Sequence, residues 1–110
     1  MTNRGDRFNE GKPELSYLLQ FPNALKGVSQ VAAFGAHKYS RYNWKKGMGH
    51  MGLVDSLLRH LTSYSEGEDI DPESGQKHVD HVAWNALALA EMVVHSPDLD
   101  DRECAIDLCS

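Results

Sequence analysis

Two segments of the chain, residues 52–65 and residues 72–95, carry apolar side chains at the three- and four-residue spacing of an α-helix. The apolar positions of the first segment form one wide stripe, made by Leu53, Val54, Leu57, Leu58, Leu61 and Tyr64. The second segment is apolar around much of its circumference, through Val79, Val82, Ala83, Ala86, Leu87, Leu89, Ala90 and Val93. Helices that are apolar on most sides are buried. We therefore expect residues 72–95 to form a central or interface helix.

The other helix signals extend this pattern. A third helical period runs from Pro22 to about Ala36, and a weak one lies near residues 105–108. Asp71 and Pro72 are expected to be the N-cap and first position of the helix over 72–95. The sequence thus predicts an all-α fold, a small bundle of three main helices plus short helical pieces.

The length of 110 residues fits one domain. We divide it into a polar N-terminal arm over 1–12, a helical domain over 13–95 and an acidic C-terminal tail over 96–110. A domain this small buries only roughly 60–70% of its unfolded surface. We therefore expect a homo-oligomer, a dimer, tetramer or higher, that buries the helix over 72–95.

Charge and hydropathy exclude several classes of partner. The net charge of -5 argues against a DNA or RNA polymer, since such binders need a cationic surface. It does not exclude a single nucleotide, whose phosphates a few cations or one metal can neutralise. The polar start is unlike a signal peptide, and no apolar run approaches the ~20 residues of a membrane span. Cys104 and Cys109 are interpreted as bystander thiols in a reducing compartment, which predicts a cytoplasmic protein.

The third helical segment presents a polar stripe on one face. His81 and Asn85 follow His78 by three and seven residues, which places all three on one face of the helix. His60 lies beside Arg59 on the preceding helix, and it can face this stripe if the two helices pack antiparallel. Imidazoles are common metal ligands and act as acids or bases near neutral pH. The alternative is that these are margin residues that face solvent.

An acidic turn over residues 66–75 separates the two helices. Its carboxylates suit Mg²⁺ or Mn²⁺, which prefer oxygen ligands. The candidate metal ligands are Glu68, Asp69, Asp71 and Glu73. Alternatively, these acids cap a helix start or are simply solvated.

The segment over 37–50 has no clean period, and we expect an ordered loop with a binding function. Lys38, and Lys12 from the arm, can meet phosphate oxygens, while Tyr39 and Trp44 can stack on a base and Asn43 can read its edge. Tyr39 and Trp44 can instead be anchors that pin the loop. No phosphate-binding glycine motif is present, and no serine or cysteine nucleophile is evident. Metal-dependent or histidine-assisted chemistry on a phosphate is then the favoured enzymatic reading.

Several short motifs together resemble a known family. They are Arg7-Phe8, Gly11-Lys12-Pro13, the run over 34–39, Asn43-Trp44, Lys46-Gly47, Arg59-His60, the acidic turn over 67–75, and His78, His81 and Asn85. Over roughly residues 7–94 the chain resembles the phage-encoded dATP/dGTP diphosphohydrolase-like family. That resemblance implies an all-α enzyme that uses a divalent metal to hydrolyse a purine deoxynucleoside triphosphate to the monophosphate and pyrophosphate.

The distantly related MazG-like pyrophosphohydrolases, which are dimers or tetramers, carry paired glutamates in an E-x-x-E pattern. This chain has H-x-x-H-x-x-x-N on its third helix and no such pair on its second. A MazG-type metal site is therefore not carried over to this sequence.

Our sequence-based hypothesis is a nucleotide hydrolase with Mg²⁺ or Mn²⁺ as cofactor. Its catalytic residues are His60, His78, His81 and Asp69. Its ligand-binding residues are Lys12, Lys38, Tyr39, Asn43, Trp44, Arg59 and Asn85. The alternative is a non-catalytic protein that sequesters a nucleotide signal of host immunity, a phage anti-defence sponge in the host cytoplasm.

Overall fold

The computed structural model describes residues 5–8 and 10–106. These residues form three long helices, α1 (Pro22–Lys38), α2 (His50–Ser65) and α3 (His78–His95). Four short helices accompany them, η1 (Leu15–Gln20), η2 (Asn43–Lys46), η3 (Pro97–Leu99) and α4 (Glu103–Ile106). Within the described ranges no strand forms, and one isolated bridge joins Ile70 to Lys77. The predicted all-α fold with three main helices is confirmed.

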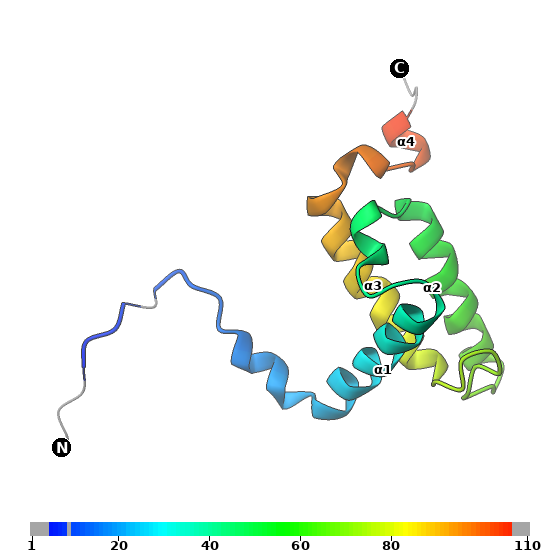
Figure 1. Cartoon of the computed structure of the whole chain (residues 1–110), viewed down its shortest axis with the longest axis horizontal. Coiled ribbons are helices and arrows are strands. Elements are labelled where there is room, and N and C mark those ends of the chain that lie inside the picture. Colours follow the sequence, from blue (N-terminus) through cyan, green and yellow to red (C-terminus); the bar gives the residue numbers. More distant parts are fainter. Residues whose placement is uncertain (1–4, 9, 107–110) are drawn as a thin grey trace.

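The helix α3 is the centre of the arrangement. It packs along α2 in the opposite direction, and α1 packs on it from another side (Figure 1). Residues 10–21, which include η1, extend away from these helices (Figure 1). No helix among the described residues is both long and apolar enough to cross a bilayer.

The apolar core between the helices is thin. Among the described residues each main helix contributes one buried apolar side chain, Val31 from α1, Leu53 from α2 and Met92 from α3, of which Met92 is fully buried. Most of the other buried side chains are polar and gather on α3 or at its ends. They are His50, His78, His81, Asn85 and Ser96. The interior between α2 and α3 is therefore built largely from hydrogen-bonding groups.

One close contact sets the distance between α1 and α3. Gly27 is buried in α1 and faces the carboxylate of Asp80 on α3, and a Cβ at this position would overlap that carboxylate. Glycine weakens a helix by roughly 1 kcal/mol relative to alanine. Here its missing side chain lets the two helices approach.

The start of α3 differs from the prediction. The helix begins at His78 rather than Pro72, and Asp71 does not cap it. The Asp71 carboxylate instead accepts hydrogen bonds from the backbone of Ser74 (3.2 Å) and Glu73 (3.4 Å), which holds residues 71–74 in a turn. Gly75 follows with a φ of 72°, a left-handed conformation that ends any helical continuation. Aspartate favours caps and turns alike, and this neighbouring glycine decides between them.

The beginning of the C-terminal segment folds against α2. The Met51 backbone N–H donates to the Asp101 carboxylate at 2.8 Å, which satisfies one open donor at the start of α2. The buried His50 ring contacts the carbonyl of Ser96 at 3.0 Å. Residues 96–101 are thus part of the bundle. The short helix expected near 105–108 begins earlier, at Glu103, while Leu108 and Cys109 lie outside the described residues.

Candidate functional site

A cleft of about 1400 Å³ lies between the C-terminal half of α1, the loop that follows it, and the paired helices α2 and α3. Ligand pockets commonly measure roughly 300–1,000 Å³, so a nucleotide with its phosphates fits in this space. The cleft lining includes all three histidines of the predicted site, His60, His78 and His81.

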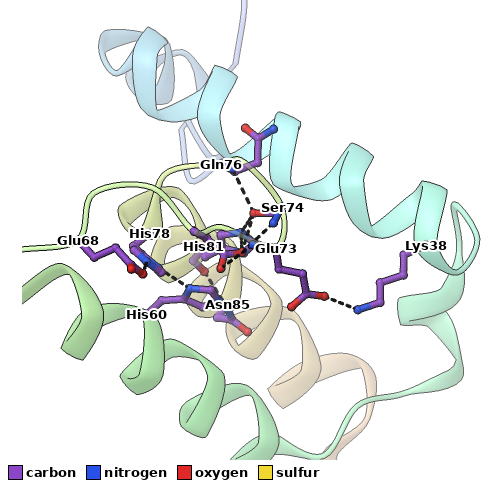
Figure 2. Close-up of polar contacts among 10 residues, drawn as sticks. Lys38, His60, Glu68, Glu73, Ser74, Gln76, His78, His81 and Asn85 are labelled. Carbon is purple, nitrogen blue, oxygen red and sulfur yellow. Dashed lines mark hydrogen bonds and ion pairs between the residues drawn. The ribbon is translucent and has the colours of Figure 1, made fainter.

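The three imidazoles meet at the bottom of this cleft. His60 Nδ1 lies 2.9 Å from His78 Nδ1, across the interface between α2 and α3. The rings of His60 and His81 stack with centroids 4.1 Å apart and planes within 5° of parallel. Figure 2 shows the three histidines close together, with His60 on α2 and the other two on α3. His78 and His81 are buried, and His60 is half-buried. The antiparallel packing of the helices therefore brings the histidine of α2 to the stripe of α3.

The loop over 66–77 folds Asp71 toward these rings. The backbone N–H of Asp71 donates to the carbonyl of Gln76 at 2.8 Å, so the loop closes on itself. The Asp71 side chain is only 15% exposed, and its Oδ2 lies 3.4 Å from His81 Nε2. Burial alone would raise the pKa of Asp71, but hydrogen bonds from Ser74 and Glu73 lower the pKa overall. Asp71 is therefore a carboxylate at neutral pH.

Ser74 links this carboxylate to the third imidazole. Its hydroxyl lies 2.8 Å from Asp71 Oδ2 and 2.7 Å from His81 Nε2. An ionised carboxylate can only accept, so the hydroxyl donates to Asp71 and accepts from the Nε2–H of His81. A serine nucleophile needs the opposite direction, with the imidazole accepting its proton. Ser74 thus positions Asp71 and His81 and is not arranged as a nucleophile.

The remaining acids of the turn have separate contacts. Glu68 Oε1 lies 2.6 Å from His78 Nε2, so Glu68 reaches the histidine cluster from outside. Glu73 pairs with Lys38 at 2.7 Å, which joins the loop to the end of α1 (Figure 2). Asp69 does not line the cleft, and only its backbone carbonyl contributes here, by accepting from the N–H of His78 at 2.9 Å. Asp71, rather than Asp69, is thus the aspartate of the turn whose side chain lies beside the histidines.

Two of the three imidazoles hold their protons weakly. Burial lowers the pKa of His60, and the nearby His81 lowers it further. Burial also lowers the pKa of His81, against the opposing effect of Asp71. Both rings are therefore neutral at pH 7, the form that can accept a proton or bind a metal ion.

Most of the predicted ligand-binding residues also line the cleft. They are Lys38, Tyr39, Asn43, Trp44, Arg59 and Asn85. Lys12 lies in the exposed segment before η1 and does not line it. The Asn85 amide donates to the carbonyl of His81 at 2.8 Å, so Asn85 is held by its own helix.

The loop between α1 and α2 carries exposed aromatic rings beside cations. The ammonium group of Lys45 lies 4.6 Å from the centroid of the Tyr42 ring. Trp44 is half-buried and tilts against His95 at 5.2 Å, so it anchors the loop to α3 while still lining the cleft. Aromatic faces next to cations are suited to a base and its phosphates.

The donor atoms at the bottom of the cleft fit a divalent metal. His60, Asp71 and His78 each offer one ligand atom, and these three atoms lie within 4.8 Å of one another. Two imidazoles and one carboxylate are an ordinary ligand set for such an ion. Only Asp71 of this set belongs to the acidic ligands predicted from the sequence.

Sequence reasoning missed one residue of the site, Ser74. Its signal is present in the sequence, because an aspartate followed by serine three residues later is typical of a turn in which the carboxylate accepts from the backbone. The glycine that follows at position 75 strengthens that reading.

Comparison with known proteins gives one family. The family model described as "dATP/dGTP diphosphohydrolase, N-terminal" matches residues 2–102. The match extends past the motifs over 7–94 to include the segment that packs on α2. Searches of curated proteins and of solved structures return no match.

Proposed function

Because this chain belongs to the dATP/dGTP diphosphohydrolase N-terminal family, we propose that it hydrolyses a purine deoxynucleoside triphosphate to the monophosphate and pyrophosphate. The observation that carries the proposal is the convergence of His60, His78 and Asp71 at the bottom of a nucleotide-sized cleft. The cleft mouth supplies the other half of the binding chemistry, with aromatic rings and the cations Lys38 and Arg59.

In this proposal the triphosphate lies with its phosphates over the histidine cluster. Water bonds to phosphorus at the α–β anhydride, the bond to the bridging oxygen breaks, and pyrophosphate leaves. A neutral imidazole or the Asp71 carboxylate accepts the proton of the water. When bound, a divalent ion at the cluster supplies charge neutralisation and lowers the pKa of the attacking water.

The direct test is pyrophosphate release from each of the four deoxynucleoside triphosphates, measured with the full chain and a divalent ion. We expect dATP or dGTP to be preferred. The purine specificity fails if all four are cleaved equally, and the hydrolase proposal fails if none is cleaved above the rate without protein.

A second candidate function is capture of a nucleotide without reaction. The exposed Tyr42 with Lys45 and Arg41 at its ring favours this reading, because such a cluster binds a base and its phosphates without supplying chemistry. The experiment that separates the two candidates incubates the protein with linear and cyclic nucleotides, denatures it and identifies what is released. Intact ligand at about one per site supports capture, and converted ligand in many-fold excess supports hydrolysis.

We also propose that copies of the chain associate. The accessible surface is 8727 Å², against roughly 6,100 Å² for a compact monomer of this mass. The excess is larger than the ~800 Å² that each partner buries in a stable interface. Apolar side chains are exposed on η1 and on α3 away from the cleft, where Val93 and Val94 lie. We propose that η1 of one copy packs against the exposed surface of α3 in another copy. Light scattering of the purified chain measures whether the mass is that of an oligomer.

A further inference from the structure

We propose that the bottom of the cleft binds a divalent transition ion, such as Zn²⁺ or Co²⁺, in preference to Mg²⁺. The ligands are His60 Nδ1, His78 Nδ1 and one carboxylate oxygen of Asp71. This inference deepens the proposed function, on which its relevance to nucleotides rests, by naming the class of metal. It replaces the all-oxygen ligand set that the acidic turn suggests from the sequence.

The kind of donor atom decides the class of metal. Mg²⁺ demands oxygen ligands in near-octahedral geometry, whereas imidazole nitrogen suits Zn²⁺, Co²⁺, Ni²⁺ and Fe²⁺. At the bottom of the cleft two of the three converging atoms are imidazole nitrogens. Glu73, an oxygen donor expected from the sequence, is occupied by Lys38 on the far side of the loop.

The distance between the two nitrogens is close to that of a metal site. At a metal–nitrogen distance of 2.0–2.1 Å, two ligands of a tetrahedral ion lie about 3.3 Å apart. The observed separation between His60 Nδ1 and His78 Nδ1 is 2.9 Å. A shift of a few tenths of an ångström across the α2–α3 interface therefore accommodates the ion.

Glu68 independently directs the lone pair of His78 inward. The His78 Nε2 atom lies 2.6 Å from the Glu68 carboxylate, which can only accept, so the proton of the neutral ring sits on Nε2. The lone pair is then on Nδ1, which faces His60. A carboxylate that orients a histidine in this way is the usual outer partner of a metal-bound imidazole. Glu68 is thus a positioning residue and not a ligand.

Asp71 keeps one oxygen available. Its Oδ2 accepts from both the backbone and the hydroxyl of Ser74, at 3.2 Å and 2.8 Å. Its Oδ1 accepts only a long 3.4 Å contact from the backbone of Glu73. The hydrogen bonds to Oδ2 therefore fix the orientation of the carboxylate, and Oδ1 retains lone pairs for a cation.

The experiment measures metal binding in the absence of nucleotide. The full chain is stripped with a chelator, dialysed and titrated with Co²⁺, followed by visible absorption, and with Zn²⁺, followed by calorimetry. We expect one ion per chain, with an affinity for Co²⁺ and Zn²⁺ at least a hundredfold above that for Mg²⁺. His60→Gln, His78→Gln and Asp71→Asn are each expected to abolish the Co²⁺ spectrum, and Glu68→Gln to weaken affinity roughly 10–100-fold.

The matched controls are Asp69→Asn and Glu73→Gln, which remove acids of the same turn that are not ligands in this proposal. Both should bind Co²⁺ as the unaltered chain does, and circular dichroism confirms that each variant is folded. The proposal is overturned if no Co²⁺ binds, if Mg²⁺ competes equally, or if a control loses as much affinity as Asp71→Asn. Transition-metal binding without pyrophosphate release would retain this site and reject hydrolysis. Hydrolysis by a chain that binds only Mg²⁺ would retain the proposed hydrolase function and reject the transition-metal site.

Discussion

The start of α3 and the short helix η1 treat polar and apolar side chains in opposite ways. At the start of α3, two imidazoles and an amide are buried beside a loop that supplies a carboxylate and a serine. In η1, by contrast, Leu15, Tyr17 and Leu19 are 72%, 62% and 69% exposed. Folded proteins normally arrange these classes the other way round. The comparison shows that the polar site residues are packed within one chain, whereas the apolar side chains of η1 are left exposed, which is where the proposed association would act.

The radius of gyration supports the same division. It is 17.9 Å, whereas a compact chain of this length has roughly 13 Å. Residues 10–21 extend away from the three main helices, in keeping with this large radius (Figure 1). Substitutions in the two regions should therefore have separable effects, on the proposed chemistry at the start of α3 and on the proposed association at η1.

The largest effect is expected at the histidine cluster. His78→Gln removes a ring that contacts both His60 and Glu68, so we expect pyrophosphate release to fall at least about a hundredfold. Asp69→Asn, nine residues earlier in the sequence, should change the rate less than about threefold, because Asp69 contributes only its backbone here. Equal losses in the two variants would show that the turn acts as a general negative surface and that the cluster has no special function.

A charge introduced into η1 should lower the molecular mass measured in solution, because it disrupts the proposed association. Leu19→Glu places a carboxylate in the proposed interface, and we expect light scattering to shift from an oligomer to a monomer. Leu58→Glu, the same substitution at an exposed leucine of α2, should leave the mass unchanged. A monomeric unaltered chain at micromolar concentration would contradict the proposed association. The prediction requires that Leu19→Glu leave the circular dichroism of the main helices intact.

The stability of the fold should depend on pH through the imidazoles of His60 and His81. The pKa of His60 and of His81 is lowered from 6.5, so the unfolded chain binds protons more readily than the folded chain. Their contribution to stability is fully present above pH 6.5 and is lost as the pH falls below that value. The pKa of Asp71 is also lowered, from 3.8, and its contribution is lost only at a pH below that value.

The measurement is the thermal unfolding midpoint between pH 8 and pH 5 in buffer with a chelator. We expect a decline that begins near pH 6.5, and His81→Gln should flatten it. A midpoint that stays constant or rises toward pH 5 would contradict the burial of neutral imidazoles. The η1 variant Leu19→Glu serves as the comparison and should retain the decline.

The smallest effect of the set is expected for Ser74→Ala. The substitution removes a donor to Asp71 and an acceptor for His81, which should cost about 1–2 kcal/mol of unfolding free energy. Denaturant titration measures this loss, and Ser65→Ala is the control, because the Ser65 hydroxyl contacts only the carbonyl of its own helix. Comparable losses in both variants would mean that Ser74 has no special place in the site.

Features that depend on residues close together in the sequence could be predicted, and features that depend on tertiary contacts could not. The three helices and the alignment of His78 with His81 follow from local periodicity, which side-chain geometry within one helix fixes. The meeting with His60 also follows, once α2 and α3 are taken as antiparallel. The true start of α3 did not follow, because Asp71-Pro72 fits a helix start as well as a turn.

The choice among the acids could not be made from the sequence. Glu68, Asp69 and Asp71 are neighbours in one turn, and their separate contacts depend on how the loop over 66–77 closes. That closure involves left-handed glycines at 67 and 75 and the bridge between Ile70 and Lys77. Tertiary packing therefore decides which carboxylate turns inward.

The contact between Gly27 and Asp80 has a consequence for the opening of the cleft. Gly27 does not line the cleft, but it is the point at which α1 rests on α3. Lys38, which pairs with Glu73 across the mouth, lies about 16 Å further along the same helix at 1.5 Å per residue. A methyl group added at residue 27 would overlap the Asp80 carboxylate, so either the Asp80 side chain or α1 would have to move. Where α1 moves, Lys38 at the edge of the cleft is displaced although no residue that lines the cleft has been replaced.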